Sequence, residues 1–175
     1  LPSEACALGE TPLLIEDFQD GKAQNWANIT AALEFNAQNG WTIVEDEPGN
    51  FVLVASNSGG FATDSYFYED LEPFGNAVWR INTKIVGKDN DAFLNWRHAW
   101  NETGDWRYII QYGGPALLDL SRLHYEAGHF GVSGSSFGFR EEQWYFFEIG
   151  TFNDTTEVWV DGDKKNSYTD PQPME

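Results

Sequence analysis

The sequence predicts an all-β protein folded as a two-sheet antiparallel sandwich. Aromatic residues make up 16% of the 175 residues, and most of them recur at every second or third position in short runs such as 79–85, 106–112 and 144–149. Alternation of apolar and polar residues is the period of a half-buried strand, and aromatic rings suit a pleated surface. Turn signals rich in Gly, Pro, Asn and Asp separate these runs, and many short strands at this spacing form a sandwich or barrel.

The individual elements follow from the same alternation and from the turn residues between the runs. A Ser- and Gly-rich stretch, 131–138, is expected to be a loop, and Ala27–Gln38 is the one helical candidate, although it lacks a clean 3.6-residue period. No internal repeat or linker is visible, so one domain is expected over residues 1–175. Strands are expected at 12–18, 41–45, 51–56, 63–69, 77–86, 91–98, 106–112, 115–121, 123–127, 143–151 and 155–161.

The charge balance limits the classes of partner. The chain carries 28 acidic and 10 basic residues, a formal net charge of −18. Such a field repels phosphate backbones and anionic membrane surfaces, so nucleic acid is not expected as a partner. It suits divalent cations and neutral ligands. No apolar run approaches the ~18 residues that span a bilayer, so membrane insertion is not expected either.

Two further features, the start of the chain and its glycosylation triplets, favour a secreted or cell-surface protein. The chain begins at Leu1 rather than Met, as a processed start would. Asn28, Asn101 and Asn153 each open an Asn-x-Thr triplet, the acceptor for N-glycosylation in a secreted protein. Cys6 is the single cysteine, so no internal disulfide can form.

The order of motifs resembles the concanavalin A-like lectin/glucanase superfamily, the laminin-G-like jelly roll, and in particular its secreted sugar-associated modules. The resemblance spans most of the chain and implies a jelly-roll sandwich with a glycan on the concave sheet face. The motifs that carry it are Leu14-Ile15-Glu16-Asp17-Phe18 with Gly21 and Trp26, Trp41-Thr42-Ile43-Val44-Glu45, Phe51-Val52-Leu53-Val54, Phe93-Leu94-Asn95-Trp96-Arg97, Tyr108-Ile109-Ile110-Gln111-Tyr112, Gln143-Trp144-Tyr145 and Val158-Trp159-Val160-Asp161-Gly162.

Catalysis is not expected. The laminarinase-type enzymes of this superfamily carry a Glu-x-Asp-x-x-Glu cluster on one strand, whereas the acidic runs 45–47 and 69–72 have a different spacing and are followed by proline. Carboxylates must alternate along a strand to share one face and flank a glycosidic bond, so these runs are interpreted as acidic turns. No Gly-x-Ser-x-Gly nucleophile elbow, which joins a strand to a helix, is expected to support serine chemistry.

Relatives in this superfamily close their sheet with one more strand after the Asp-Gly hairpin. Here the chain reaches Asp170-Pro171 where that strand is expected to begin. The strand expected at 12–18 would then lack a neighbour, and an open edge is a template for another strand. Three segments could fill the gap: an internal one such as Cys6–Phe18, one from another molecule, or a lost downstream peptide whose cysteine would partner Cys6. Of these, a partner chain or a lost peptide is expected.

Alternation sorts the expected central strands into an apolar face and a polar face. The polar face is rich in planar side chains that donate or accept hydrogen bonds, with a ring that can stack on a pyranose. The alternative is a structural network in which Arg97 and Arg107 pair with Glu148 or Asp119. Trp96 and Trp106 fill either the core or a binding rim. The expected ligand-binding residues are Arg80, Asn95, Arg97, Arg107, Gln111, Glu148 and Trp159.

Calcium is the expected metal, because hard carboxylate oxygens are abundant and related sandwiches often hold an ion between the first strand and the last hairpin. The three histidines lack zinc-ligand spacing. The candidate calcium ligands are Glu16, Asp17 and Asp161, with Asp20 and Asp163 nearby in sequence.

These observations favour a secreted carbohydrate-binding or adhesive module without catalysis, whose partner is a polysaccharide or glycan. The second hypothesis is a structural subunit of an extracellular surface layer or filament, in which copies of the chain share strands. The third is a polysaccharide hydrolase or lyase of the same fold.

Overall fold

The computed structural model of the chain is all-β in the part that it describes, which comprises residues 9–21, 26–28, 41–55, 66–68, 75–87, 91–101, 104–113, 117–124 and 128–173. None of these residues is helical, and hence none forms a helix long and apolar enough to cross a membrane. The chain divides into two compact units, Leu1–Pro73 and Phe74–Glu175, which are described separately. The expectation of a single domain over residues 1–175 stays a prediction.

The first unit contains two antiparallel strand pairs. Strand β1 (Trp26–Asn28) pairs with β4 (Tyr66–Tyr68), and β2 (Trp41–Glu47) forms a hairpin with β3 (Asn50–Ala55). Gly49 stands in the hairpin turn at a φ of 81°, a left-handed conformation that glycine adopts without steric cost. The side-chain amide of Gln19 donates to the carbonyl of Phe51 at 3.0 Å and accepts from its N–H at 3.2 Å, so it adds a strand-like pairing beside the hairpin.

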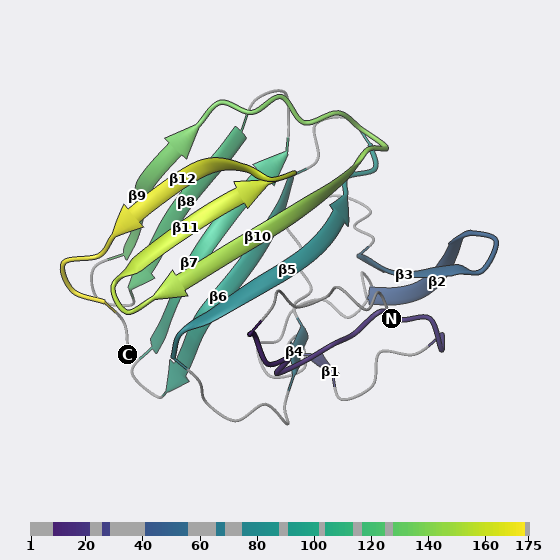
Figure 1. The fold of residues 1–175 in the computed structure, drawn as a ribbon, viewed down its shortest axis with the longest axis horizontal. Helices are drawn as coiled ribbons and strands as arrows, with labels where there is room; N and C mark the ends of the chain where they lie inside the picture. The colour runs from purple at the N-terminus through teal and green to yellow at the C-terminus, as the bar shows by residue number, and fades with distance from the viewer. Residues whose placement is uncertain are drawn as a thin grey trace. The chain divides into compact units, whose positions relative to one another are not determined.

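The second unit is a sandwich of two four-stranded antiparallel sheets (Figure 1). The first sheet has the order β12-β11-β10-β5, and the second has the order β6-β7-β8-β9. The strands are β5 (Ala77–Lys84), β6 (Asp91–Asn101), β7 (Gly104–Gly113), β8 (Leu117–His124), β9 (Gly128–Ser135), β10 (Trp144–Phe152), β11 (Thr155–Val160) and β12 (Asp163–Thr169).

The core of the sandwich lies between these two sheets, and it is largely aromatic. Trp96 stacks on Tyr108 with ring centroids 5.9 Å apart, and Tyr112 packs at 4.7 Å against Phe147, which is fully buried. Such ring pairs add to the stabilisation that comes from burying their apolar area. The buried cluster comprises Trp96, Tyr108, Ile110, Tyr112, Leu118 and Leu120 from the second sheet and Tyr145, Phe147, Ile149, Val158 and Val160 from the first.

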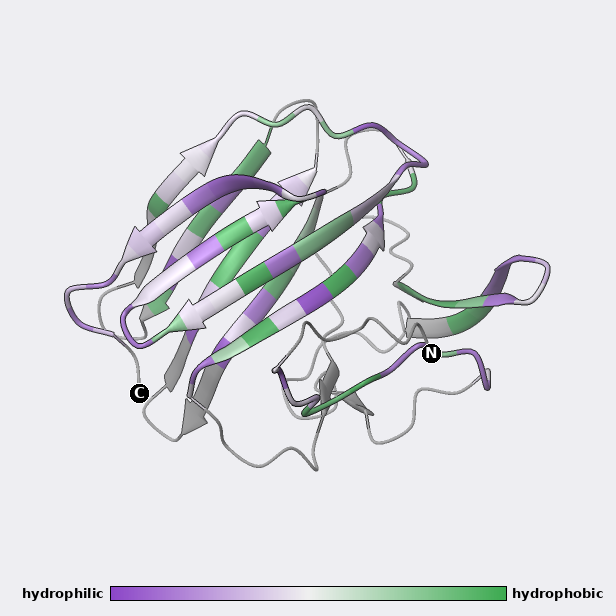
Figure 2. Cartoon of the chain, viewed as in Figure 1, coloured by the Kyte–Doolittle hydropathy of each residue, from purple (hydrophilic) through white to green (hydrophobic). Residues whose placement is uncertain are grey.

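The predicted alternation holds along β5, β10 and β11. Figure 2 shows apolar and polar residues alternating along β5 and β10. On β10, Tyr145, Phe147 and Ile149 are buried, while Glu148 between them is only half-buried. Because successive side chains of a strand point to opposite faces, Glu148 lies on the outer face of the first sheet.

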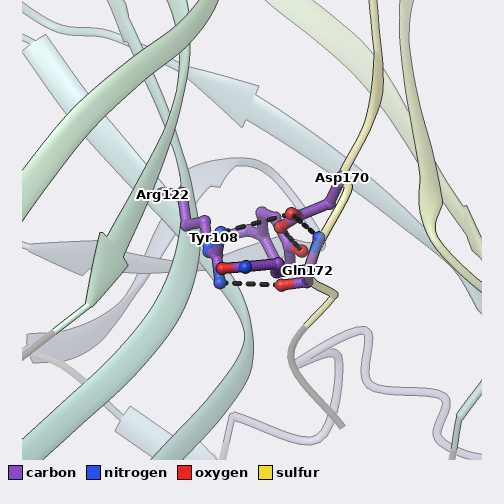
Figure 3. Close-up of polar contacts among 4 residues, drawn as sticks. All are labelled: Tyr108, Arg122, Asp170 and Gln172. Atoms are coloured by element: carbon purple, nitrogen blue, oxygen red, sulfur yellow. Dashed lines mark hydrogen bonds and ion pairs between the residues drawn. The ribbon is translucent and has the colours of Figure 1, made fainter. Parts of the chain in front are cut away.

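A buried carboxylate fastens the segment after β12 to the second sheet (Figure 3). The Tyr108 hydroxyl donates to Asp170 Oδ2 at 2.6 Å, and Arg122 Nη1 donates to Oδ1 at 3.2 Å. The N–H of Gln172 also donates to Oδ1 at 2.8 Å, and the Gln172 carbonyl accepts from Arg122 Nη2 at 2.8 Å. Each oxygen of the buried charge therefore has a partner, as burial requires.

The all-β, two-sheet antiparallel sandwich is confirmed, whereas membership of the concanavalin A-like superfamily stays a prediction. Four local expectations are wrong. Residues 12–18 form no strand, residues 131–135 of the expected loop belong to β9, and one continuous strand, β8, spans the expected break at 122. Strand β12 follows the Asp-Gly turn where no strand was expected. The expected helix Ala27–Gln38 starts within β1 and otherwise lies outside the described residues.

The correction at 12–18 also removes the reason for expecting strand sharing there. That hypothesis required a first strand with an unpaired edge, and the described backbone of these residues makes no strand at all. The hairpin β11–β12 supplies the outer strand of the first sheet from within the chain.

Candidate functional site

Three of the expected ligand-binding residues lie in one row across the outer face of the first sheet. In the β-sheet register, Arg80 of β5 lies opposite Glu148 of β10, and Glu148 lies opposite Trp159 of β11. Residues that are directly opposite on one face lie within contact distance of each other. Arg80 Nε donates to Glu148 Oε2 at 2.8 Å, so an ion pair stands next to the indole ring.

A second ion pair borders the same ring. Lys164 of β12 lies opposite Trp159 in the register, and its ammonium lies 5.5 Å from the centre of the indole, within cation–π range. The same ammonium donates to Glu157 Oε1 at 2.8 Å. This hydrogen bond lowers the pKa of the Glu157 carboxyl.

The outer face is hollowed at this point into an open groove of about 300 Å³. Part of its floor is Gly150, which has no side chain and lies between Val78 of β5 and Glu157 of β11 in the register. A Cβ at Gly150 would lie 3.2 Å from the ring of Phe152, so this ring lies over the glycine. The groove is lined by Val78, Arg80, Glu148, Gly150, Phe152, Glu157, Trp159 and Gly162.

Hydrogen bonds from Arg97 and Asn76 fix the turn at one end of the groove. Arg97 has a φ of 47°, unusual for a residue with a side chain, at a register shift in β6. Its Nη1 donates to the Asn153 carbonyl at 2.9 Å, in the turn that follows Phe152. The Asn153 N–H donates to Asn76 Oδ1 at 2.6 Å. Arg97 thus links the second sheet to the turn between β10 and β11 and to the segment before β5.

The remaining expected ligand residues lie on the other sheet. Asn95 belongs to β6 and lies opposite Ile109, whereas Arg107 and Gln111 belong to β7. The expectation that all seven residues share one face is therefore wrong: alternation assigns a residue to one side of its own strand, but it does not say which strands share a sheet. Ligand binding by Asn95, Arg97, Arg107 and Gln111 stays a prediction. Among the described residues, Glu148 forms its ion pair with Arg80 rather than with Arg97.

The structure answers for one of the two tryptophans, Trp96 and Trp106, whether it belongs to the core or to a binding rim. Trp96 is 3% exposed and belongs to the core. The side chain of Trp106 lies outside the described part.

The sequence interpretation missed the floor and one side of the groove. Gly150 and Phe152 lie at the end of an expected strand, and neither a glycine nor a phenylalanine by itself indicates a binding site. Lys164 and its ion pair with Glu157 were missed because β12 was not expected. The Asp161-Gly162 turn was the available signal, because a two-residue turn of this type calls for a returning strand.

The candidate calcium ligands make main-chain hydrogen bonds. Glu16 Oε1 accepts from the Phe18 N–H at 2.9 Å, Asp17 Oδ1 accepts from the Gln19 N–H at 3.1 Å, and Asp161 Oδ1 accepts from the Phe146 N–H at 2.9 Å. Among the described residues, no three His, Cys, Asp or Glu side chains are grouped as a metal site would require. Calcium binding stays a prediction.

Of the three glycosylation acceptors, only Asn153 has a described side chain. It is exposed in the turn between β10 and β11. The side chains of Asn28 and Asn101 lie outside the described part, and glycosylation at all three positions stays a prediction.

The fold and the groove define a β-sandwich protein with a polar and aromatic depression on one sheet. No family model matches the sequence, and no curated protein matches it. Among solved structures, the chain is similar to the carbohydrate-binding module CBM66 from Bacillus subtilis, with 10% sequence identity, a TM-score of 0.49, and coverage of 83% of this chain and 80% of that one. A likeness at this level does not assign a ligand to this chain.

Proposed function

We propose that the protein binds carbohydrate, without catalysis of its own, in the groove on the outer face of the first sheet. The observation that carries the proposal is the row Arg80–Glu148–Trp159, which combines an ion pair with an aromatic ring beside a groove of about 300 Å³. The C–H face of a sugar ring suits stacking on an indole. Its hydroxyls donate to carboxylates and accept from guanidinium groups.

The pairing of the two groove carboxylates favours binding rather than hydrolysis. Glycoside hydrolysis requires one carboxyl group that is protonated and can donate to the leaving oxygen. Glu148 instead accepts from a guanidinium, and Glu157 accepts from an ammonium that lowers its pKa. Paired in this way, both side chains are suited to accept hydrogen bonds from sugar hydroxyls.

A secreted or cell-surface location is part of the proposal. Its support is the three Asn-x-Thr triplets in the sequence and the exposed position of Asn153.

The test is affinity electrophoresis and a glycan array, with Trp159→Ala compared with Trp144→Ala. Trp144 is a matched control because it lies on the outer face of the same sheet, is 40% exposed, and has the Lys84 ammonium 4.9 Å from its ring centre. It does not line the groove. We expect Trp159→Ala to weaken binding of the recognised saccharide at least about tenfold, or ~1.4 kcal/mol, and Trp144→Ala to leave it unchanged.

Two outcomes would contradict the proposal. The first is the absence of binding by the wild-type chain to every saccharide of the array. The second is binding that both variants retain in full, because that result places the ligand elsewhere. Thermal melts of both variants establish that a loss of binding is not a loss of folding.

A further inference from the structure

The groove carries balanced charge on a protein that is strongly acidic as a whole. Arg80, which lines the groove, is paired at 2.8 Å with Glu148, and Glu157, which also lines it, is paired at 2.8 Å with Lys164 beside the groove. The formal charge of these four groups is therefore zero, whereas the whole chain carries −18.

An anionic saccharide would meet two obstacles at this site. The summed field of the protein repels it before contact. At the groove, its carboxylate or sulfate could pair with Arg80 only by competing with Glu148, whose side chain is 31% exposed and would lose its partner. An uncharged sugar meets neither obstacle, because a hydroxyl can donate to a carboxylate and accept from a guanidinium while the ion pair stays closed.

The size of the groove limits the length of the ligand. Its volume of about 300 Å³ lies at the lower end of the range of ~300–1,000 Å³ that is usual for small-molecule sites. The Phe152 ring lies over Gly150 at one end. The next residue, Asn153, is fastened by Arg97 and Asn76 at 2.9 and 2.6 Å, so this end is held by the hydrogen bonds of two other segments.

From the balanced charge and the small volume we infer that the groove recognises an uncharged saccharide through a short segment of one to three sugar rings. This inference rests on the proposed carbohydrate binding. It goes further by naming the charge and the length of the ligand.

The charge is tested with polymers that share a backbone and differ in charge, fully methyl-esterified against de-esterified homogalacturonan, together with neutral glucans, mannans and fructans. We expect binding only to uncharged members, with a Kd that changes less than about twofold between 50 and 500 mM NaCl, since no phosphate-like or carboxylate contact has to be screened. The Gly150→Ala variant places a methyl group on the groove floor and should weaken that binding at least about tenfold.

The length is tested by isothermal titration of the recognised sugar as a trisaccharide and as a hexasaccharide. We expect the two Kd values to agree within about threefold.

The outcomes separate this inference from the proposal on which it rests. Three results would overturn the inference: binding to a charged polymer, a Kd that depends steeply on salt, or an affinity gain of more than about tenfold from trisaccharide to hexasaccharide. If the Gly150→Ala substitution abolishes the binding in that case, the groove is still the binding site. If no saccharide binds the wild-type chain, the proposed function fails, and this inference fails with it.

Discussion

The buried carboxylate of Asp170 offers the sharpest test of how the sandwich is held together. Its side chain is fully buried, and it accepts hydrogen bonds from Tyr108, Arg122 and the Gln172 N–H. The Asp170→Ala substitution would leave the Arg122 guanidinium, 18% exposed, without its carboxylate and the buried Tyr108 hydroxyl without its acceptor. Removing one partner of a buried ion pair costs about 3–5 kcal/mol.

We therefore expect Asp170→Ala to lower the free energy of unfolding by about 3–5 kcal/mol. For a domain of about 150–250 residues, each kcal/mol shifts the melting temperature by about 2–4 °C, so a fall of more than about 6 °C is expected. The assay is urea unfolding followed by tryptophan fluorescence, with the m-value compared between variants to confirm that the same surface unfolds.

The control is Asp163→Ala, at the start of β12, the strand that precedes Asp170. The Asp163 side chain is 80% exposed and lies 3.4 Å from Lys165, an exposed pair that contributes about 0–1 kcal/mol. Tyr108→Phe alone should cost about 1.5–3 kcal/mol, because its hydrogen bond is to a charged group. Its effect should largely disappear in the Asp170→Ala background. A loss below about 1 kcal/mol for Asp170→Ala, or a loss equal to that of Asp163→Ala, would refute this reasoning.

Two further predictions concern a buried phenol and the expected metal. Burial raises the pKa of Tyr112 to about 12, so between pH 10 and pH 12 the unfolded chain loses this proton first and stability falls with rising pH, by about 3 kcal/mol in total. Tyr112→Phe should remove this part of the pH dependence of the urea midpoint, and an unchanged slope would show that the phenol does not cause it. Calcium should raise the melting temperature, since an ion that binds only the folded chain stabilises it by about 2.7 kcal/mol at 100 times its Kd. Magnesium is the control, and a melting temperature indifferent to both millimolar calcium and chelator would remove the expected metal site.

The strands that the sequence predicted well are those with an apolar face in the core. The ranges 77–86, 143–151 and 155–161 correspond closely to β5, β10 and β11, because Phe147 and its neighbours on that face are buried between the sheets and the alternation records that burial. The same alternation correctly assigned Arg80, Glu148 and Trp159 to an outer face.

The strands that the sequence missed are held in an extended conformation by backbone pairing with a neighbouring strand, and their composition does not indicate a strand. Strand β12 is polar and lies at the edge of its sheet, and β9 is rich in Gly and Ser and lies at the edge of the other. Edge strands often carry lysine and small residues, which single-sequence propensity assigns to loops. Conversely, Leu13, Leu14 and Ile15 are apolar and yet exposed, and no strand pairs with them among the described residues.

The division of the site residues between two sheets could not be predicted for a related reason. Which strands are neighbours depends on long-range pairing, such as that of β5 with β10, whose paired residues Arg80 and Glu148 are separated by 68 positions in the sequence. Only the structure shows that Arg80 and Trp159 share a face with Glu148, while Asn95 and Gln111 belong to the second sheet.

The most direct test of groove binding is a titration of the ¹⁵N-labelled protein with the recognised saccharide, followed through side-chain NMR signals. The two faces carry different reporters: the Trp159 indole and the Arg80 guanidinium on the first sheet, and the amides of Asn95 and Gln111 on the second. We predict that the signals of Trp159 and Arg80 shift in proportion to occupancy, while that of the Trp144 indole stays fixed. Shifts confined to the Asn95 and Gln111 amides, with the Trp159 signal unmoved, would contradict the account.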